Sequence, residues 1–392
     1  MENRVFFVFF MYNMAMRTTK AIVYLDRFLG NFKAIQERIG PQRRICVPVK
    51  ADAYGHGATE IARLSVEAGA FCLGVATVQE GEALRNEGIS APILLFSQSL
   101  PYEIPEIIKN ELSPLVSDSE IIEILAKTAS EAGIRLPVHL KIDTGMGRIG
   151  CKPAEAPSLA KKIAASNALE YAGTATHLAV SDSTAPEDRA YTEQQIAIFK
   201  EALEQIRAGG VDPGIVHAAN SGAVVLHPDA WFDMIRPGII LYGYNLTGTP
   251  SPKIEPVMEL RTSVTLIKRV KKGETVSYGR TWSAPHDTAI AILPVGYADG
   301  LPRLVSNKWQ AVIGGKTYPL VGRICMDQCM ADLGPDSVSP VGREVRRWDE
   351  ASIFGGPAPS AAILAERIGT IPYEITCNIN KRVPRVYVTK EK

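Results

Sequence analysis

A lysine at the end of an apolar run has the clearest chemical potential in the sequence. Residues 45–50 are apolar up to Lys50, where an ammonium group would be poorly solvated. The alternative, a surface lysine whose stem lies along apolar neighbours, fits this position less well. Burial lowers the pKa of a lysine, and the neutral amine can act as a nucleophile or a base. Lys50 is therefore a candidate functional residue, and its position alone leaves a structural role open.

Polar and glycine-rich segments follow several other apolar runs. Their glycines can present backbone amides to an anion, although a loop glycine is more often only part of a turn. A single histidine such as His177 is likewise more often structural than catalytic. The segments are Lys141 with residues 143–148, Thr176-His177, residues 220–222 and residues 236–238.

Spacing disfavours two other kinds of site. The glycines within 145–150 match a dinucleotide-binding fingerprint only in part and follow a run in the middle of the chain, so no nucleotide site is predicted. Cys325 and Cys329 form the one close cysteine pair, without a second pair at the spacing of metal ligands. No metal is predicted.

Short apolar runs alternate with amphipathic segments such as 120–131 and 194–207, as in consecutive β-α units. Eight such units predict a parallel (β/α)8 TIM barrel of the α/β class, whose active sites lie at the carboxyl ends of the strands. The polar segments above should therefore converge. The runs are residues 45–50, 71–77, 93–97, 112–116, 138–142, 172–178, 215–219 and 234–242.

The second part of the chain has a different pattern. β-rich runs, one of them turning through Gly314-Gly315, indicate a mainly antiparallel β domain with one helix at 361–368. We expect a barrel at 20–250 and a β domain at 251–392. Residues 1–19 form an N-terminal extension, either disordered or included by a start site placed too early. The runs are residues 263–270, 289–295, 311–318 and 383–388.

Composition limits the partners and the cellular location that can be expected. A net charge of +1 gives no field that would attract nucleic acid or an anionic membrane. The apolar stretch 5–16 is too short to span a bilayer and lacks the features of a signal peptide. The 6 cysteines are scattered, as expected for reduced thiols in the cytoplasm.

The segment 47–57, Val-Pro-Val-Lys-Ala-Asp-Ala-Tyr-Gly-His-Gly, resembles the pyridoxal-phosphate attachment motif of alanine racemases. Further segments resemble this family in the same order, over nearly the whole chain after residue 20. They are residues 141–150, 176–179, 217–221, 236–239, 276–282, 295–300, 323–328 and 371–374.

The resemblance implies a fold, an activity and an assembly. Members of this family have a (β/α)8 barrel followed by a β domain. They are isomerases that interconvert L-alanine and D-alanine with pyridoxal 5'-phosphate. Their D-alanine supplies peptidoglycan. They form homodimers in which the β domain of one subunit completes the barrel site of the other.

Racemisation requires two acid/base groups, because the proton leaves one face of the substrate carbon and returns to the other. The resemblance assigns the D-side proton to Lys50, which also carries the cofactor, and the L-side proton to Tyr278 of the partner. A tyrosine is a poor base at neutral pH, so positive charge must favour its phenolate. The family's chain from Arg236 through His177 to Tyr278 fits this need.

The remaining roles also rest on the resemblance. Lys141 occupies a position that is commonly carbamylated, where its negative charge would orient Arg148. Tyr297 and Tyr373 would narrow the entrance, which favours alanine over larger amino acids. Cofactor binding maps to Lys50, Tyr54, His177, Asn220, Ser221, Arg236, Gly238, Ile239 and Tyr373, and substrate binding to Arg148, Met326, Asp327 and Tyr297.

Two other functions remain as alternatives. Pyridoxal-phosphate decarboxylases share the architecture but usually have a different lysine motif and a Gly-Pro-x-Cys-Asp-Ser run, which is missing here. Non-catalytic cofactor-binding proteins resemble the barrel alone and lack a β domain with a Tyr278 motif.

Overall fold

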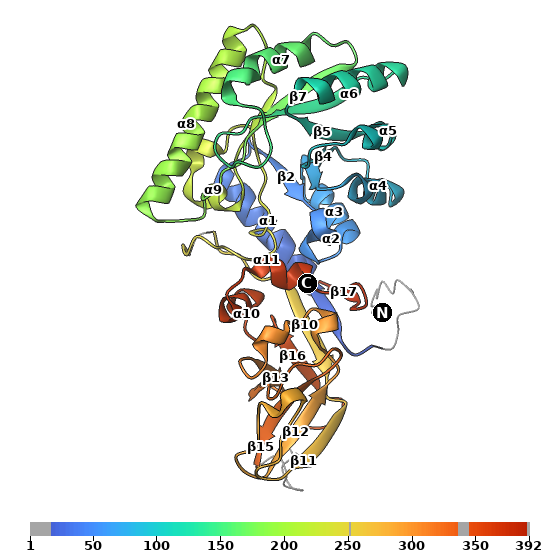
Figure 1. Ribbon diagram of the computed structural model, residues 1–392, viewed down its shortest axis with the longest axis vertical. Coiled ribbons are helices and arrows are strands. Elements are labelled where there is room, and N and C mark those ends of the chain that lie inside the picture. Colours follow the sequence, from blue (N-terminus) through green and yellow to red (C-terminus); the bar gives the residue numbers. More distant parts are fainter. Residues whose placement is uncertain (1–16, 251, 336–344, 390–392) are drawn as a thin grey trace, which may run out of the picture. The chain divides into compact units, whose positions relative to one another are not determined.

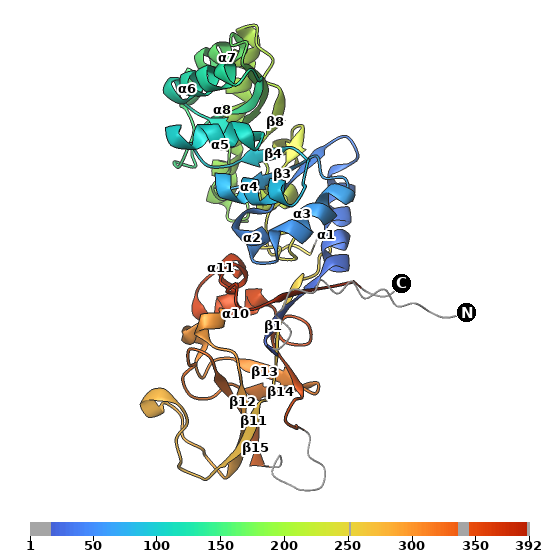
Figure 2. The ribbon, with the colours of Figure 1, turned by 90° about the vertical axis from the view of Figure 1, so that its right-hand side faces the viewer.

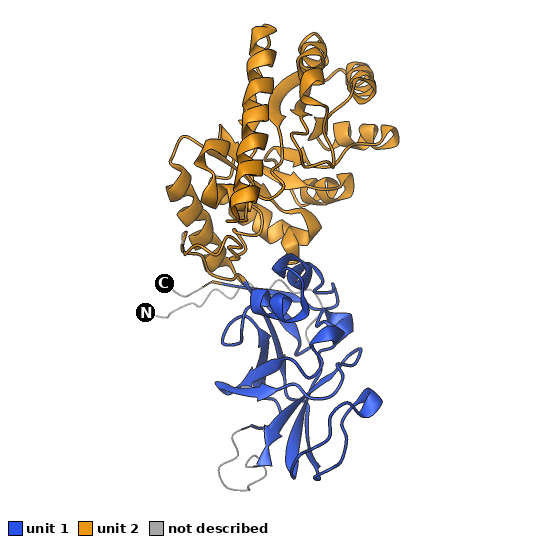
Figure 3. Ribbon diagram, turned by 60° about the vertical axis from the view of Figure 1, so that its left-hand side comes forward, with its two compact units in different colours: residues 1–23, 258–388 blue, residues 24–257, 389–392 orange. Residues whose placement is uncertain are grey.

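The computed structural model describes residues 17–250, 252–335 and 345–389, so the apolar stretch 5–16 lies outside the described residues. The chain divides into two compact units (Figure 3). The barrel unit comprises Tyr24–Val257. The β unit comprises Met258–Val388 and the described part of Met1–Val23.

Parallel strands form the centre of the barrel unit, and helices pack around them (Figures 1 and 2). The 8-stranded sheet has the order β8-β7-β6-β5-β4-β3-β2-β9. The Asp233 amide donates to the Val216 carbonyl at 3.0 Å, and the Arg236 amide donates to the Ala219 carbonyl at 2.8 Å. These bonds join the β9 end to the β8 end, which confirms the predicted barrel. The strands are β2 (Arg44–Pro48), β3 (Cys72–Val75), β4 (Ile93–Leu95), β5 (Leu112–Val116), β6 (Leu136–Lys141), β7 (Leu169–Ala175), β8 (Ile215–His217) and β9 (Met234–Ile235).

The barrel helices begin where the sequence supplies capping side chains. Asp118 accepts a hydrogen bond from the Ile121 amide at 2.9 Å and so caps α6 (Ser119–Glu131), whose apolar residues face the strands. The predicted segment 194–207 lies within the longer α8 (Pro186–Ala208). The other helices are α1 (Leu25–Ile39), α2 (Lys50–Tyr54), α3 (Ala58–Glu67), α4 (Val78–Asn86), α5 (Ile104–Lys109), α7 (Ala156–Ala164) and α9 (Ser221–Leu226).

Antiparallel pairing dominates the β unit, as expected. One sheet has the order β14-β13-β16-β10-β1-β17, and a 3-stranded sheet has the order β11-β12-β15. The predicted helix is α10 (Ala361–Ile368), followed by α11 (Pro372–Cys377). The strands are β1 (Lys20–Tyr24), β10 (Met258–Ser263), β11 (Leu266–Val270), β12 (Thr288–Leu293), β13 (Gln310–Ile313), β14 (Lys316–Pro319), β15 (Cys329–Gly334), β16 (Glu350–Phe354) and β17 (Arg385–Val388).

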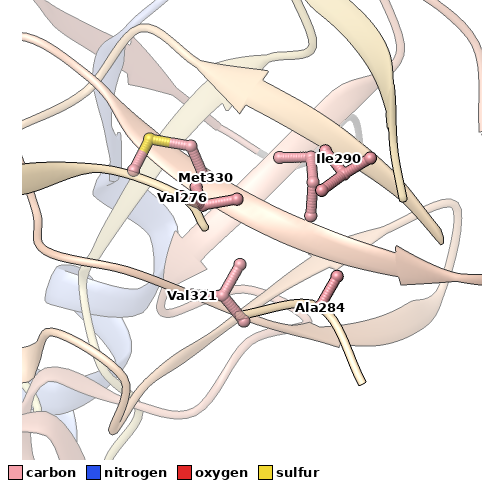
Figure 4. Close-up of a cluster of buried hydrophobic side chains, with 6 residues drawn as sticks. Val276, Ala284, Ile290, Val321 and Met330 are labelled. Atoms are coloured by element: carbon pink, nitrogen blue, oxygen red, sulfur yellow. The ribbon is translucent and has the colours of Figure 1, made fainter. Parts of the chain in front are cut away.

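A cluster of buried side chains packs beside the 3-stranded sheet (Figure 4). Its members come from strands and from the loops between them, so it fixes those loops in place. They are Val270, Val276, Ala284, Ile290, Val321 and Met330.

Strand β1 belongs to the β unit, whereas the expected barrel begins at residue 20. Lys20 pairs with Arg261 of β10. Thr19 is buried, and Arg17 forms an ion pair with Asp299 at 2.6 Å. No sequence signal links these residues to partners so far along the chain.

Among the helices of the described ranges, none is long and apolar enough to cross a membrane.

Candidate active site

Lys50 opens a left-handed turn instead of ending a strand, because β2 stops at Pro48. Ala51, Asp52, Ala53 and Tyr54 all have φ between 51° and 54°. This conformation costs about 1–2 kcal/mol per non-glycine residue, so contacts must hold it. The half-buried Lys50 is thereby separated from the strand, and Tyr54 is turned into the barrel unit, where it is 6% exposed.

Glu80 of α4, which is absent from the predicted site residues, makes one such contact. Its Oε1 accepts from the Ala51 amide at 2.7 Å, and its Oε2 accepts from the Ala76 amide at 2.7 Å. Thr77 and Glu80 also form a capping box at the start of α4. The Thr-x-x-Glu pattern could have revealed the cap, but not the bond to Ala51.

Tyr54, Ser221 and Gly238 form a cradle of hydroxyls and amides. A Cβ on Gly238 would lie 2.8 Å from the Tyr54 hydroxyl and 3.7 Å from Ser221 Oγ, so only glycine leaves this space open. Ser221 Oγ accepts from the Gly238 amide at 2.9 Å and from the Ile240 amide at 3.4 Å. Ile239 lies between these amides and is fully buried. Such donors suit a phosphate-sized anion.

Asn220 holds the start of α9 beside this cradle. Its Oδ1 accepts from the Ala223 amide at 3.2 Å and from Ser181 Oγ at 2.5 Å, while its Nδ2 donates to the Leu178 carbonyl at 3.1 Å. The side chain is therefore engaged with the protein and orients the neighbouring Ser221.

Arg236 is a buried cation that donates in several directions. Its Nη1 donates to His217 Nδ1 at 2.5 Å, and its Nη2 donates to the Thr176 carbonyl at 2.7 Å. Nη2 also lies 3.4 Å from His177 Nδ1. Burial lowers the pKa of Arg236 to about 10, which still leaves it charged near neutral pH.

His217 and His139 form a neutral pair behind Arg236. Because a guanidinium can only donate, His217 Nδ1 is an acceptor, and its protonated Nε2 donates to His139 Nδ1 at 3.0 Å. Burial and the charge of Arg236 lower the pKa of His139 to about 3 and lower that of His217 well below its usual range. A Cβ on Gly173 would lie 2.4 Å from His139 Nδ1, so the pair needs glycine there.

His177 marks the point where several predicted residues converge. Burial lowers its pKa well below the usual range, and the charges of Lys141, Arg236, Arg148 and Lys50 lower it further, in that order. These residues come from different strand ends, as the barrel predicts. The guanidinium groups of Arg236 and Arg148 beside a neutral ring suit anionic ligands.

Lys141 lies at the end of β6 and is 5% exposed. Burial lowers its pKa most, followed by the charges of Arg236 and Arg148, while Asp143 acts in the opposite direction. The neutral amine is thereby favoured. Asp143 is itself engaged within its own loop, since its Oδ1 accepts from the Gly145 amide at 3.0 Å.

Tyr278 belongs to the β unit and is 71% exposed. Its neighbour Ser277, at φ 69°, donates through Oγ to the Arg323 carbonyl at 2.6 Å and so fixes the turn. A cavity of about 340 Å³, lined partly by Ser277, Cys325 and Met330, lies beside the tyrosine.

The predicted substrate residues Tyr297, Met326 and Asp327 lie together in the β unit. The Tyr297 amide donates to the Cys325 carbonyl at 3.1 Å, and the adjoining Ala298 amide donates to the Met326 carbonyl at 3.0 Å. Tyr297 and Met326 are 43% and 53% exposed. Tyr373 is half-buried on α11.

Arg382, which the sequence analysis missed, ties this group to the core of the β unit. Its Nη2 donates to Asp327 at 2.7 Å and its Nε donates to the buried Asp299 at 2.7 Å. Asp299 in turn accepts from the Gly296 amide at 2.9 Å. No motif in the sequence signals this link.

Comparisons with known proteins agree over most of the chain. The family model "Alanine racemase, N-terminal domain" matches residues 23–246, and "Alanine racemase, C-terminal domain" matches residues 257–387. The chain is 48% identical to the alanine racemase of Treponema denticola, over 95% of this chain and 99% of that protein.

Solved structures are similar over the same length. An alanine racemase from Streptomyces coelicolor has a TM-score of 0.88 and 37% identity, covering 96% of this chain and 99% of that one. One from Bacillus anthracis, with bound L-Ala-P, has a TM-score of 0.85 and 34% identity, covering 95% of each chain.

Proposed function

The chain belongs to the alanine racemase family, an isomerase family, and we propose that it interconverts L-alanine and D-alanine by a two-base mechanism with pyridoxal 5'-phosphate as its cofactor. The observation that carries this proposal is the set of side chains at the strand ends of the barrel unit. Lys50 follows β2, the loop after β6 carries Arg148, and the buried Arg236 lies 3.4 Å from His177 Nδ1. This arrangement provides an amine for covalent attachment and cations for an anionic cofactor and an anionic substrate.

The residues of the barrel unit fit this cofactor. The hydroxyls of Tyr54 and Ser221 suit its phosphate, because they line the space that a Cβ on Gly238 would fill. We assign the amides of Gly238 and Ile239 to the same phosphate. Tyr373 would add a hydroxyl, and Asn220 keeps Ser221 in place.

The other end of the cofactor would meet Lys50 and Arg236. Lys50 would hold its carbonyl carbon covalently, Arg236 would face its ring nitrogen, and His177 would lie beside the ring. When bound, this cofactor withdraws electrons and makes the α-proton of an amino acid acidic.

Lys50 and Tyr278 are the two proposed acid/base groups. Lys50 Nζ exchanges the proton on the D side and the Tyr278 hydroxyl exchanges it on the L side, because one group cannot reach both faces. Positive charge from Arg236, relayed through His177, favours the phenolate of Tyr278.

Carboxylate binding is assigned to Arg148 and to the Met326 backbone, with Asp327 and Tyr297 shaping the pocket for a methyl side chain. The low pKa of Lys141 favours its carbamylation, in which the neutral nitrogen bonds to the carbon of CO2 and releases a proton to water. The resulting anion would orient Arg148. Labelling with ¹³CO2 should give a carbamate NMR signal that Lys141→Met removes, and its absence from the wild type would refute the modification.

We also propose a homodimer in which Tyr278 serves the partner's barrel. The exposure of Tyr278, Tyr297 and Met326 supports a covered surface on the β unit. We further propose that the enzyme works in the cytoplasm, in keeping with its 6 free cysteines. The D-alanine made there would supply peptidoglycan. Deleting the gene should create a D-alanine requirement, unless a second racemase is present.

Isotope exchange in D2O tests the two-base proposal. The wild type should convert L-alanine to D-alanine, detected with D-amino-acid oxidase, and the product should carry solvent deuterium. Tyr278→Ala should still exchange the α-proton of D-alanine but not that of L-alanine, with racemisation reduced at least about 10³-fold. Equal loss of exchange from both enantiomers would contradict the assignment.

Activity also separates the alternatives. Decarboxylation would release CO2 from the supplied amino acid, and a non-catalytic carrier would bind the cofactor without turning over either enantiomer. Either result in place of racemisation would overturn the proposed function.

A further inference from the structure

A buried glutamine on α8 connects two loops of the candidate site. Gln195 is 1% exposed. Its Nε2 donates to the His177 carbonyl at 3.2 Å and lies 3.4 Å from Thr144 Oγ1, while its Oε1 accepts from the Ala179 amide at 2.9 Å. One amide therefore holds the loop after β7 and the loop after β6.

Tyr191 lies one turn earlier on the same face of α8. Its hydroxyl donates to the Gly145 carbonyl at 2.8 Å, and a Cβ on Gly145 would lie 2.5 Å from that hydroxyl. The loop that carries Arg148 is thus attached to α8 at two successive residues, Thr144 and Gly145.

The contacts continue from Gln195 to Arg236. Thr144 Oγ1 and Thr176 Oγ1 are hydrogen-bonded at 2.8 Å, and the Thr176 carbonyl accepts from Arg236 Nη2 at 2.7 Å. A shift of the Gln195 amide would therefore displace the backbone that sets the distance between Arg236 and His177.

We propose that Gln195 is a positioning residue for the racemisation reaction, and that Tyr191 assists it on the Arg148 side. This inference rests on the proposed function. Gln195 fixes both the Arg148 loop, which would bind the substrate carboxylate, and His177, which would relay charge from Arg236. Tyr191 contacts only the first of these, so the two residues should affect different kinetic constants.

The test compares two variants with a matched control. Tyr191→Phe removes one hydrogen bond, and should raise the KM for L-alanine about 2- to 10-fold with kcat within about twofold. Gln195→Met loosens both loops, and should raise KM and also lower kcat about 10-fold or more. Gln194→Met changes the exposed neighbour on the same helix and should leave both constants unchanged.

Binding of propionate, an acid without the amino group, gives a second readout. Its inhibition constant should rise in parallel with KM in both variants. A merely structural Gln195 would lower the melting temperature but leave KM and the propionate constant of the folded fraction unchanged. If Gln195→Met does not fold, Gln195→Glu keeps the acceptor for Ala179 and removes the donor to His177, and should show the same effects.

The outcomes separate the two proposals. An active wild type with unchanged constants in Tyr191→Phe and in the folded Gln195 variant overturns the positioning role alone. A wild type without racemase activity overturns the proposed function, and the positioning role with it.

Discussion

Arg236 shows how single residues set the electrostatics of the site. Its hydrogen-bond acceptors His217 and Thr176 are neutral, so its charge is spread over dipoles instead of being cancelled by a carboxylate. Burial is the largest cause of the lowered pKa values of His139, His177 and His217, and the uncompensated charge of Arg236 lowers them further.

Arg236→Glu should increase transamination relative to racemisation roughly 10-fold or more. Arginine would leave the ring nitrogen of the cofactor unprotonated, whereas the carboxylic acid of glutamate can protonate it. The ratio is measured as pyruvate formed against D-alanine formed. Arg236→Lys retains a cation and should keep the ratio low. An unchanged ratio in the glutamate variant would refute this account of Arg236.

Acid should destabilise the fold through His139. Its pKa is about 3 when folded, against about 6.5 when unfolded, so the unfolded chain binds the extra proton between these values. Stability is therefore intact above pH 6.5 and falls as the pH decreases, by up to about 1.4 kcal/mol per unit for this group.

Urea unfolding between pH 7 and pH 5 checks this expectation. His139→Gln, which can still accept from His217, should flatten the pH dependence of the free energy of unfolding. The exposed His286→Gln is the control and should keep the wild-type slope. Parallel slopes for the wild type and His139→Gln would contradict the linkage.

At the scale of elements, the left-handed turn of α2 is the least expected local structure. Four consecutive non-glycine residues have positive φ. Asp52 accepts from the Ala58 amide at 2.8 Å, and Glu80 accepts from the Ala51 amide, so the first two residues of the turn are tied to α3 and α4. These bonds stabilise the strained backbone next to Lys50, where the proposed function needs an amine in a fixed position.

Replacing alanine by glycine should not destabilise the protein in this turn, but should destabilise it in an ordinary helix. Ala51→Gly should leave the free energy of unfolding unchanged or raise it by up to about 1 kcal/mol, because glycine relieves the strain of positive φ. Ala83→Gly, at an exposed position of α4, should lower it by about 1 kcal/mol. Equal losses in chemical denaturation of both variants would argue against the left-handed turn.

Elements with local signals could be predicted from the sequence. Strand β5 and helix α10 have the predicted bounds, because β5 is a short, mostly apolar run and the apolar residues of α10 follow the helical repeat of 3.6 residues. The α2 turn could not be predicted, since neither alanine nor tyrosine favours positive φ.

Predicted site residues were recognisable by their motifs at strand ends, whereas supporting residues were not. Glu80, Gln195 and Arg382 act on backbone or side chains brought close only by folding. Their residue types are common on surfaces, so nothing in their local sequence distinguishes them.

At the scale of the whole molecule, the two proposed acid/base residues lie in different units. Lys50 belongs to the barrel unit and Tyr278 belongs to the β unit. The hydrogen bonds described above for each part of the proposed site lie within one unit. The proposed chemistry needs both.

Mixing two inactive variants tests whether Tyr278 acts on the partner's barrel. In a dimer of Lys50→Ala with Tyr278→Ala, one site would combine an intact Lys50 with an intact Tyr278, so unfolding and refolding the mixture should restore up to about one quarter of wild-type activity. Each variant refolded alone is the control. If both residues acted within one subunit, the mixture would stay inactive.

Strand β1 has a consequence for synthesis of the chain. It is among the first described segments to leave the ribosome, yet Lys20 pairs with Arg261, which is made only after the barrel. At ordinary translation rates the strand waits on the order of tens of seconds for its neighbour. The barrel is thus an insertion that can fold while the β unit is still incomplete, and the nascent chain exposes an unpaired edge until β10 emerges.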